Sequence, residues 1–374
     1  MSLGRSNDGD TGRVSVARHL RAWVVLLLTV CLLISMVGCG KKPPADGGTA
    51  AGGQPESTEK GEGETKEETA KTKVKVALLL PGPIDDAGWN GNAYKGLVEA
   101  AEKFGIETSY MEKIPQAEFE AAFRDYASQG YDLVIGHGFE FQDAAKKVAG
   151  EFPEVKFVVF NGSVSAEPNL ASVHFLDWQP GYLAGAVAGL ITKTNRVGVI
   201  GGLEIPVIKS AVDAYKVAAE TVNPKVKVAS SYVGTFEDIA KGKETALAMI
   251  NNGADVIMCD ADQVGVGSIM ACKEKGVYAV GFVNDQSEVA PDTVIASALY
   301  RTGVLVEYAV KNVVEGTFKS EVVGIGIKEG AHGLVWNPKF KEKMPDTVSR
   351  LDQIIKDMID GKIEPPEGST PSSG

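Results

Sequence analysis

The stretch RVGVIGG, residues 196–202, shows the pattern that decides the fold of this chain. Its residues are almost all apolar and do not alternate with polar ones, and the same holds for VKVALLL at 74–80 and DLVIG at 132–136. Such unbroken runs are typical of strands buried on both faces inside a parallel sheet, whereas a half-solvated strand alternates. These runs therefore predict parallel sheets that are covered by helices on both sides.

Strands of this kind recur along the chain, five before Asp177 and five after it. They are predicted at Val74–Leu80, Glu107–Met111, Asp132–Gly136, Phe157–Asn161, Ser172–Phe175, Arg196–Gly201, Val226–Tyr232, Asp255–Asp260, Tyr278–Val283 and Val294–Leu299. Helical patterns lie between them, as at 92–104, 180–191 and 239–251. This alternation predicts an α/β fold with two doubly wound lobes. Ligands of such sheets collect at the carboxyl ends of the strands, so two facing lobes would enclose a cleft there.

The N-terminus carries the parts of an export signal. A polar, arginine-containing stretch precedes an apolar run of about 15 residues at 23–37, which is shorter than the roughly 20 residues needed to span a bilayer. Cys39 follows Gly38 directly, and this junction resembles a bacterial lipobox, in which the cysteine is lipidated. We therefore predict a signal peptide at 1–38 and a mature protein anchored through Cys39 to the extracytoplasmic face of the cell membrane. A plain N-terminal membrane anchor is the alternative.

Polar segments flank the body of the protein. Residues 39–73 consist mainly of Gly, Pro, Glu, Lys and Thr, a composition that cannot bury a core and predicts a disordered tether after the lipidated cysteine. Residues 365–374 are predicted to form a disordered tail. The roughly 290 residues between them are enough for two lobes.

The net charge restricts the partners. The 374 residues carry a formal charge of −11, which becomes −13 without the four arginines and two aspartates of the first 38 residues. Nucleic acid and anionic lipid both require a basic surface, so the charge argues against either as the binding partner.

No motif indicates catalysis. The chain lacks a nucleophile elbow, a zinc-protease motif and a phosphate-binding loop, and its four histidines lie near no candidate nucleophile. Asp260, Asp262 and Asp285 follow strands, where carboxylates serve binding clefts as well as active sites. Cys259 and Cys272 lack metal-ligand spacing and are predicted to be buried free thiols rather than a disulfide. The sequence thus predicts no enzyme, no metal site and no cofactor.

Four strings carry a family resemblance. They are PGPIDDAGWNGNAYKGL at 81–97, YDLVIGHGFEFQDAAKKVAGEFPEVKFVVFNG at 131–162, QPGYLAGAVAGLITKTNRVGVIGG at 179–202 and KGVYAVGFVNDQ at 275–286. They resemble the basic membrane protein family of solute-binding lipoproteins for ABC transporters, which includes purine-nucleoside binders. The resemblance implies a type I periplasmic-binding-protein fold, in which three hinge strands join two lobes that close on a ligand. It implies an N-terminal lobe of 74–177 and about 297–325, and a C-terminal lobe of 178–296 and about 326–364.

The resemblance also implies a site for a flat base. In the D-x-x-W-N motif at 86–90, Trp89 would stack on the base, with Asp86 and Asn90 as polar contacts, and Tyr215 would supply the second aromatic face. Stacking of a base on an aromatic ring is worth about 1–3 kcal/mol. The other contacts that we predict are Phe139, Asn161, Trp178, Asp260 and Asp285.

Three positions depart from the nucleoside-binding pattern. Asn161 and Val283 stand where aspartates are common in the family, and Tyr300 stands where a lysine is common. The missing groups are those expected to hold the base edge and the ribose hydroxyls. Their loss favours a free nucleobase or another flat heterocycle over a nucleoside.

Each predicted contact has a structural alternative. Asp86 and Asn90 sit where residues cap the next helix, and Trp89 could close the core of its lobe. Trp178 could pack at the hinge, and Tyr215 lies on an apolar helix face that suits a core.

The resulting interpretation is a monomeric, membrane-anchored receptor. It captures a purine-like small molecule and presents it to an ABC permease. A sugar or autoinducer receptor, and a sensor that uses the same fold without transport, are the alternatives.

Overall fold

The computed structural model describes residues 73–86 and 88–367, all within one unit of the chain, Thr69–Gly374. The predicted signal peptide, Cys39 and nearly all of the tether lie outside the described residues, as do residues 368–374 of the predicted tail. Within the described part, no helix is long and apolar enough to cross a membrane.

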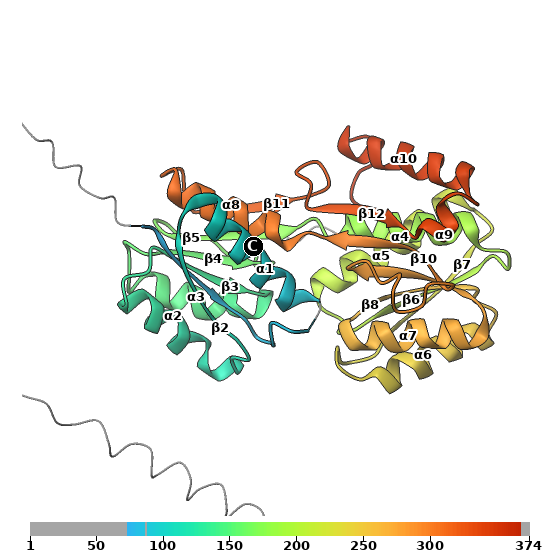
Figure 1. Ribbon diagram of the computed structural model, residues 1–374, viewed down its shortest axis with the longest axis horizontal. Coiled ribbons are helices and arrows are strands. Elements are labelled where there is room, and N and C mark those ends of the chain that lie inside the picture. Colours follow the sequence, from blue (N-terminus) through green and yellow to red (C-terminus); the bar gives the residue numbers. More distant parts are fainter. Residues whose placement is uncertain (1–72, 87, 368–374) are drawn as a thin grey trace, which may run out of the picture. The chain divides into compact units, whose positions relative to one another are not determined.

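The first sheet forms the N-terminal lobe (Figure 1). Its strand order is β11-β5-β4-β3-β1-β2, and all neighbours are parallel. The strands are β1 (Lys75–Leu79), β2 (Glu107–Met111), β3 (Leu133–His137), β4 (Lys156–Phe160), β5 (Leu170–Phe175) and β11 (Val322–Ile325).

The second sheet forms the C-terminal lobe. Its order is β12-β10-β9-β8-β6-β7, with β12 antiparallel to β10 and every other pair parallel. The strands are β6 (Arg196–Gly201), β7 (Lys227–Tyr232), β8 (Val256–Asp260), β9 (Tyr278–Val283), β10 (Val294–Tyr300) and β12 (His332–Trp336).

Helices cover both faces of each sheet, as Figure 1 shows. In the N-terminal lobe, α1 (Trp89–Phe104) and α8 (Thr302–Val314) pack together on one face, and α2 (Phe119–Ser128) and α3 (Gln142–Ala149) cover the other. In the C-terminal lobe, α4 (Trp178–Ile191) and α5 (Pro206–Val222) oppose α6 (Ile239–Asn251) and α7 (Asp262–Lys275). The remaining elements are η1 (Gln116–Glu118), η2 (Phe139–Phe141), α9 (Pro338–Lys341) and α10 (Pro345–Ile359).

Strand composition follows position in the sheet. Every residue of the inner strands β3 and β8 is buried, whereas the edge strands β2 and β7 expose polar side chains. An inner strand must be apolar because helices cover both of its faces, while an edge strand meets solvent. The predicted α/β class with two doubly wound parallel lobes is confirmed.

The chain crosses between the sheets three times: after β5, after β10 and after β11. The second crossing comes after Tyr300, later than the boundary near 297 expected from the sequence, because β10 stays paired with β9 and β12 up to its last residues. The third crossing begins after Ile325.

All ten predicted strands are present, with ends shifted by one or two residues. Strands β11 and β12 were not predicted from the sequence. The strand β11 is apolar but only four residues long, and at the edge of its sheet only Ile325 of them is buried. Helix α1 begins at Trp89, three residues earlier than the predicted start.

The two cysteines of the body are free and buried, as predicted. Cys259 and Cys272 belong to the apolar cluster between the second sheet and helices α6 and α7. They fill core volume as small apolar side chains.

Candidate ligand-binding site

A pocket of about 270 Å³ lies where the carboxyl ends of strands from both sheets meet. The N-terminal lobe contributes Trp89, Phe139 and Asn161, which follow β1, β3 and β4. The C-terminal lobe contributes Phe236, after β7, and Asp260, the last residue of β8. Ligands of open α/β sheets bind outside this edge. The pocket is therefore in the place where the sequence predicted a site.

The imidazole of His137 packs against the indole of Trp89 and holds it in position. The two rings stack with centroids 4.1 Å apart and planes 20° apart, and Nε2 of His137 donates to the Trp89 carbonyl oxygen at 3.0 Å. His137 is fully buried, and this burial lowers its pKa to about 4, so the ring is neutral at physiological pH. Trp89 thus rests on a rigid, uncharged support while it lines the pocket.

The Asp86 carboxylate organises the start of α1. One oxygen accepts hydrogen bonds from the backbone of Gly88 and Gly91, and the other accepts from the backbone and side-chain nitrogens of Asn90, all at 2.8–2.9 Å. These are the contacts of a helix cap. Asn90 still lines the pocket, whereas Asp86 does not and borders a neighbouring hollow. Asp86 therefore makes the contacts given as its structural alternative.

Two residues of the pocket wall have backbone in the left-handed region. Asn161 has φ 56°, and its Oδ1 accepts a hydrogen bond from the Phe175 nitrogen at 3.0 Å. Val283 has φ 69°, which β-branched residues strongly disfavour. Strain of this kind costs about 1–3 kcal/mol and clusters at functional sites. Both positions are departures from the family pattern that the sequence analysis identified.

Two buried carboxyl groups line the pocket near each other. Asp177 and Asp260 are each 6% exposed, and Tyr300 hydrogen-bonds to Asp177. Burial and the nearby Asp260 raise the pKa of Asp177 well above its usual range, and the Tyr300 bond only partly offsets this. Burial, followed by repulsion from Asp262, raises the pKa of Asp260 to about 8. Asp260 therefore holds its proton near neutral pH, and burial favours the protonated form of Asp177 as well.

Further carboxyl groups line the rim. Burial and repulsion from Asp86 and Glu237 raise the pKa of Asp262 to about 6, and burial raises that of Glu140. The lobes approach closely at this rim, since a Cβ atom on Gly88 would lie 3.1 Å from Oδ1 of Asp262. The site is thus acidic on both of its sides.

Phe236 supplies the aromatic ring of the C-terminal lobe. A Cβ atom on Gly202 would lie 2.5 Å from this ring, so the ring packs directly on the Gly202 backbone. The Phe236 carbonyl oxygen accepts from the Gln263 nitrogen at 2.9 Å, which ties the loop to α7. Tyr215, which was predicted to supply the second aromatic face, does not line this pocket.

Three predicted contacts lie elsewhere. Tyr215 is fully buried between α5 and α4, and Trp178 is buried beside Tyr182, with ring centroids 6.4 Å apart. Both belong to the apolar core, as their structural alternatives stated. Asp285 borders two neighbouring hollows, and its Oδ1 accepts from the Ser287 nitrogen at 3.0 Å.

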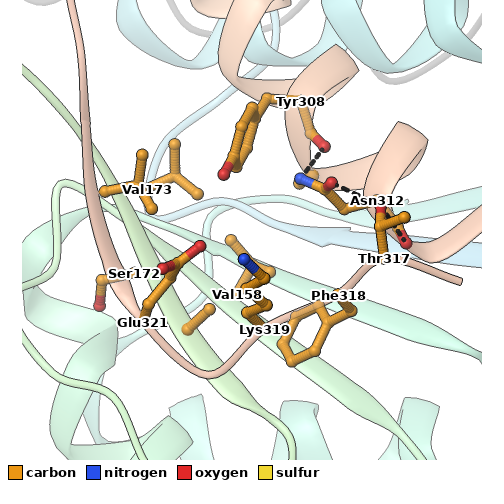
Figure 2. A pocket seen from close by; sticks show the side chains of 12 residues that line it. Val158, Ser172, Val173, Tyr308, Asn312, Thr317, Phe318, Lys319 and Glu321 are labelled. Atoms are coloured by element: carbon orange, nitrogen blue, oxygen red, sulfur yellow. Dashed lines mark hydrogen bonds between the residues drawn. The ribbon is translucent and has the colours of Figure 1, made fainter.

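Figure 2 shows a different pocket of about 300 Å³, inside the N-terminal lobe. Tyr308 and Asn312 of α8 face the strand residue Val158 across it, and Phe318 and Lys319 come from the loop that follows. The Asn312 amide donates to the Tyr308 carbonyl at 3.0 Å. Since a single lobe forms this pocket, a ligand in it would not contact the C-terminal lobe.

The sequence analysis missed several residues of the interlobe pocket. They are Glu140, Asp177, Phe236 and Glu237. A usable signal was present, since each follows the end of a strand by two to five residues.

Two α/β lobes, three crossings and a pocket at the facing strand ends define a two-lobed solute-binding protein. Residues 73–371 match the family described as "ABC transporter substrate-binding protein PnrA-like" (Bmp), and the chain belongs to this family. The predicted resemblance is thereby confirmed.

Individual relatives agree with this placement. The chain is 30% identical over 273 residues to basic membrane protein A1 of Borrelia garinii subsp. bavariensis, which covers 71% of this chain and 81% of that protein. It is 30% identical over 302 residues to a purine-binding protein of Brucella abortus, covering 79% and 84%. A crystal structure of an ABC transporter solute-binding protein from Aeropyrum pernix K1 is similar, with TM-score 0.69, 26% identity and coverage of 79% and 94%.

Family membership settles the general class of activity. The chain is a substrate-binding protein of the ABC transporter type with the type I fold, and this family is not one of enzymes. Proteins of this class act outside the cytoplasm.

Proposed function

We propose that this protein captures a flat heteroaromatic ligand between its two lobes and delivers it to an ABC permease. The observation that carries the proposal is the pair of aromatic rings in the interlobe pocket, Trp89 from the N-terminal lobe and Phe236 from the C-terminal lobe. A ring held between them would contact both lobes, and two stacking faces are worth about 1–3 kcal/mol each.

Capture proceeds by closure of the lobes on the ligand. A ligand stabilises the closed arrangement only through contacts that the open one lacks, and contacts to both lobes meet this condition. Nδ2 of Asn92 in α1 donates to Oδ1 of Asn284 after β9 at 2.8 Å, so the lobes also bond directly outside the pocket. Closure would bring the Trp89 and Phe236 sides of the pocket together around the bound ring.

The proposed ligand is purine-like, and a free base is favoured over a nucleoside. The relative from Brucella abortus is named for purine binding, which supports this class of ligand. Asn161, Val283 and Tyr300 lack the carboxylates and the ammonium that would hold ribose hydroxyls and the base edge. A buried tyrosine and a strained valine offer fewer polar contacts to a sugar.

The proposal includes a membrane anchor. A signal peptide at 1–38, lipidation of Cys39 and a polar tether at 39–73 would hold the monomeric body near its permease. Radiolabelled palmitate incorporation that disappears in Cys39→Ala tests this part, and labelling of that variant would contradict it.

A thermal-shift screen tests the choice of ligand. The purified protein is heated with nucleobases, nucleosides, pentoses and hexoses, together with Trp89→Ala and the control Phe318→Ala, which alters only the pocket of Figure 2. A ligand at a hundredfold excess over its Kd stabilises the fold by about 2.7 kcal/mol. We expect purines to raise the Tm of the wild type and the control but not of Trp89→Ala. A response to sugars alone would replace this proposal with the sugar-receptor alternative.

A further inference from the structure

The interlobe pocket is lined by carboxyl groups without a matching cation. Five acidic side chains border it: Glu140, Asp177, Glu237, Asp260 and Asp262. Among the described residues, no lysine or arginine lines the pocket, and none of these five carboxylates forms an ion pair. The acids come from both lobes, so closure brings carboxyl groups together with no lysine or arginine of the described residues between them.

Some acidic side chains outside the pocket are paired with basic ones. Arg124 bonds Glu151 at 2.8 Å, and Lys147 bonds Glu120 at 2.6 Å. These pairs are at the surface, where pairing contributes little. Inside the pocket, an ionised carboxylate is costly unless a cation pairs with it, and no cation from the described residues lines the pocket.

Among the five, Asp260 is the residue whose missing hydrogen-bond partner matters most. Its side chain is 6% exposed, lines the pocket, and makes no side-chain hydrogen bond to any described residue. Buried polar groups are nearly always satisfied by a partner, and a carboxyl group has room for several donors. Hydrogen-bond donors to the Asp260 carboxyl group therefore come from the pocket, where a bound molecule can supply them.

We infer that the ligand carries a positive charge: it is a flat aromatic cation whose charged N–H groups meet Asp260 and Asp177 while its ring lies on Trp89. This inference rests on the proposed function and adds the charge of the substrate. A cation over an indole face gains further attraction from the ring. An organic cation suits the site better than a metal ion, because no three metal-ligating side chains come together in the part of the chain described.

A matched pair of probes tests the charge. Benzamidine and benzamide have nearly the same size and shape, but only benzamidine is cationic at neutral pH. Isothermal titration of the purified protein should show benzamidine binding about tenfold or more tightly, the usual worth of a hydrogen bond to a charged group. Adenosine and its N1-methylated cation form a second pair, for which we expect the same order.

Variants locate the effect. Asp260→Asn should remove the preference for benzamidine, whereas Asp352→Asn, at an exposed position of α10, should keep it. The comparison of probes on the wild type does not depend on how well either variant folds.

The outcomes separate the two proposals. If benzamide or any neutral purine binds as tightly as its cationic counterpart, the inference is overturned and the capture function stands. If no probe and no compound of the thermal-shift screen binds, both are overturned.

Discussion

Replacing Asp260 by Asn should change how the stability of this protein depends on pH. Burial raises the pKa of Asp260 from 3.8 to about 8, so between these values the folded protein holds a proton that the unfolded chain releases. The free energy of unfolding then falls as pH rises, by about 1.4 kcal/mol per pH unit. A side-chain amide does not titrate in this range, so this contribution disappears in Asp260→Asn.

The magnitude follows from the width of the window. From about pH 5 to about pH 8, the wild type should lose about 4 kcal/mol relative to the variant, and above about pH 8 the difference should be constant. At about 2 °C per kcal/mol for a body of this size, the relative Tm shifts by about 8 °C. The titratable groups that interact with Asp260 are Asp177, Asp262, Tyr300, Tyr232 and Cys259, and none of them is a cation that would restore its usual pKa.

Differential scanning calorimetry of both proteins without ligand, at intervals of about half a pH unit, measures the difference. A constant offset between the two Tm curves from about pH 5 to about pH 8 would refute the reasoning, since it would mean that Asp260 is ionised and solvated throughout.

Two further changes test the packing and the protonation around the site. Gly185→Ala should destabilise the protein by about 1–3 kcal/mol in urea unfolding, because the new Cβ would collide with the backbone of Tyr215 in α5. A Cβ on Gly150 meets nothing within 4 Å, so the control Gly150→Ala should change little, and equal effects of the two changes would contradict the close packing. His137→Leu should reduce the loss of stability on acidification below about pH 6.5. Burial lowers the pKa of His137 to about 4, so between these pH values only the unfolded chain takes up a proton, and by about pH 4 the free energy of unfolding of the wild type should fall by about 3 kcal/mol more than that of the variant. Parallel curves of stability against pH would show that the ring is solvated.

The sequence predicted the sheets well because inner strands carry their own signal. Residues 133–136 and 256–259 lie between covered faces, so their apolar runs follow directly from burial. The strand β11 (VVGI) is also apolar, but it has only four residues and lies at a sheet edge, where only Ile325 of them is buried. Its pairing with β5 depends on where the chain crosses back between the lobes, which no local pattern encodes.

The aromatic residues of the site were harder to assign. Tyr215 follows a helical apolar pattern. Its helix α5 packs closely against Gly181 and Gly185 of α4, and the Tyr215 side chain is fully buried in the core. Phe236 lies in a loop after an edge strand, without periodicity, and reaches the pocket because Gly202 leaves room for its ring. Only the tertiary packing of two separate segments distinguishes these two roles.

The polar residues show the same limit. The D-x-x-W-N motif predicted both capping and ligand contact, and the structure assigns capping to Asp86 and places Asn90 and Trp89 at the pocket. The sequence did not indicate a role for Asp177, because a single aspartate between a strand and a helix is common. Its importance comes from Asp260, which lies far away in sequence and close in space.

In the proposed function, both lobes hold the ligand through one aromatic ring each, Trp89 and Phe236. Isothermal titration of adenine, guanine, adenosine and guanosine into the wild type, Trp89→Ala, Phe236→Ala and the control Phe318→Ala tests it most directly. We predict that the tightest of these ligands loses about 5- to 150-fold in affinity with either site variant, the worth of one stacking face, and nothing with the control. Unchanged affinity in Phe236→Ala or in Trp89→Ala would contradict the account, because the ligand would then be held without one of the two rings.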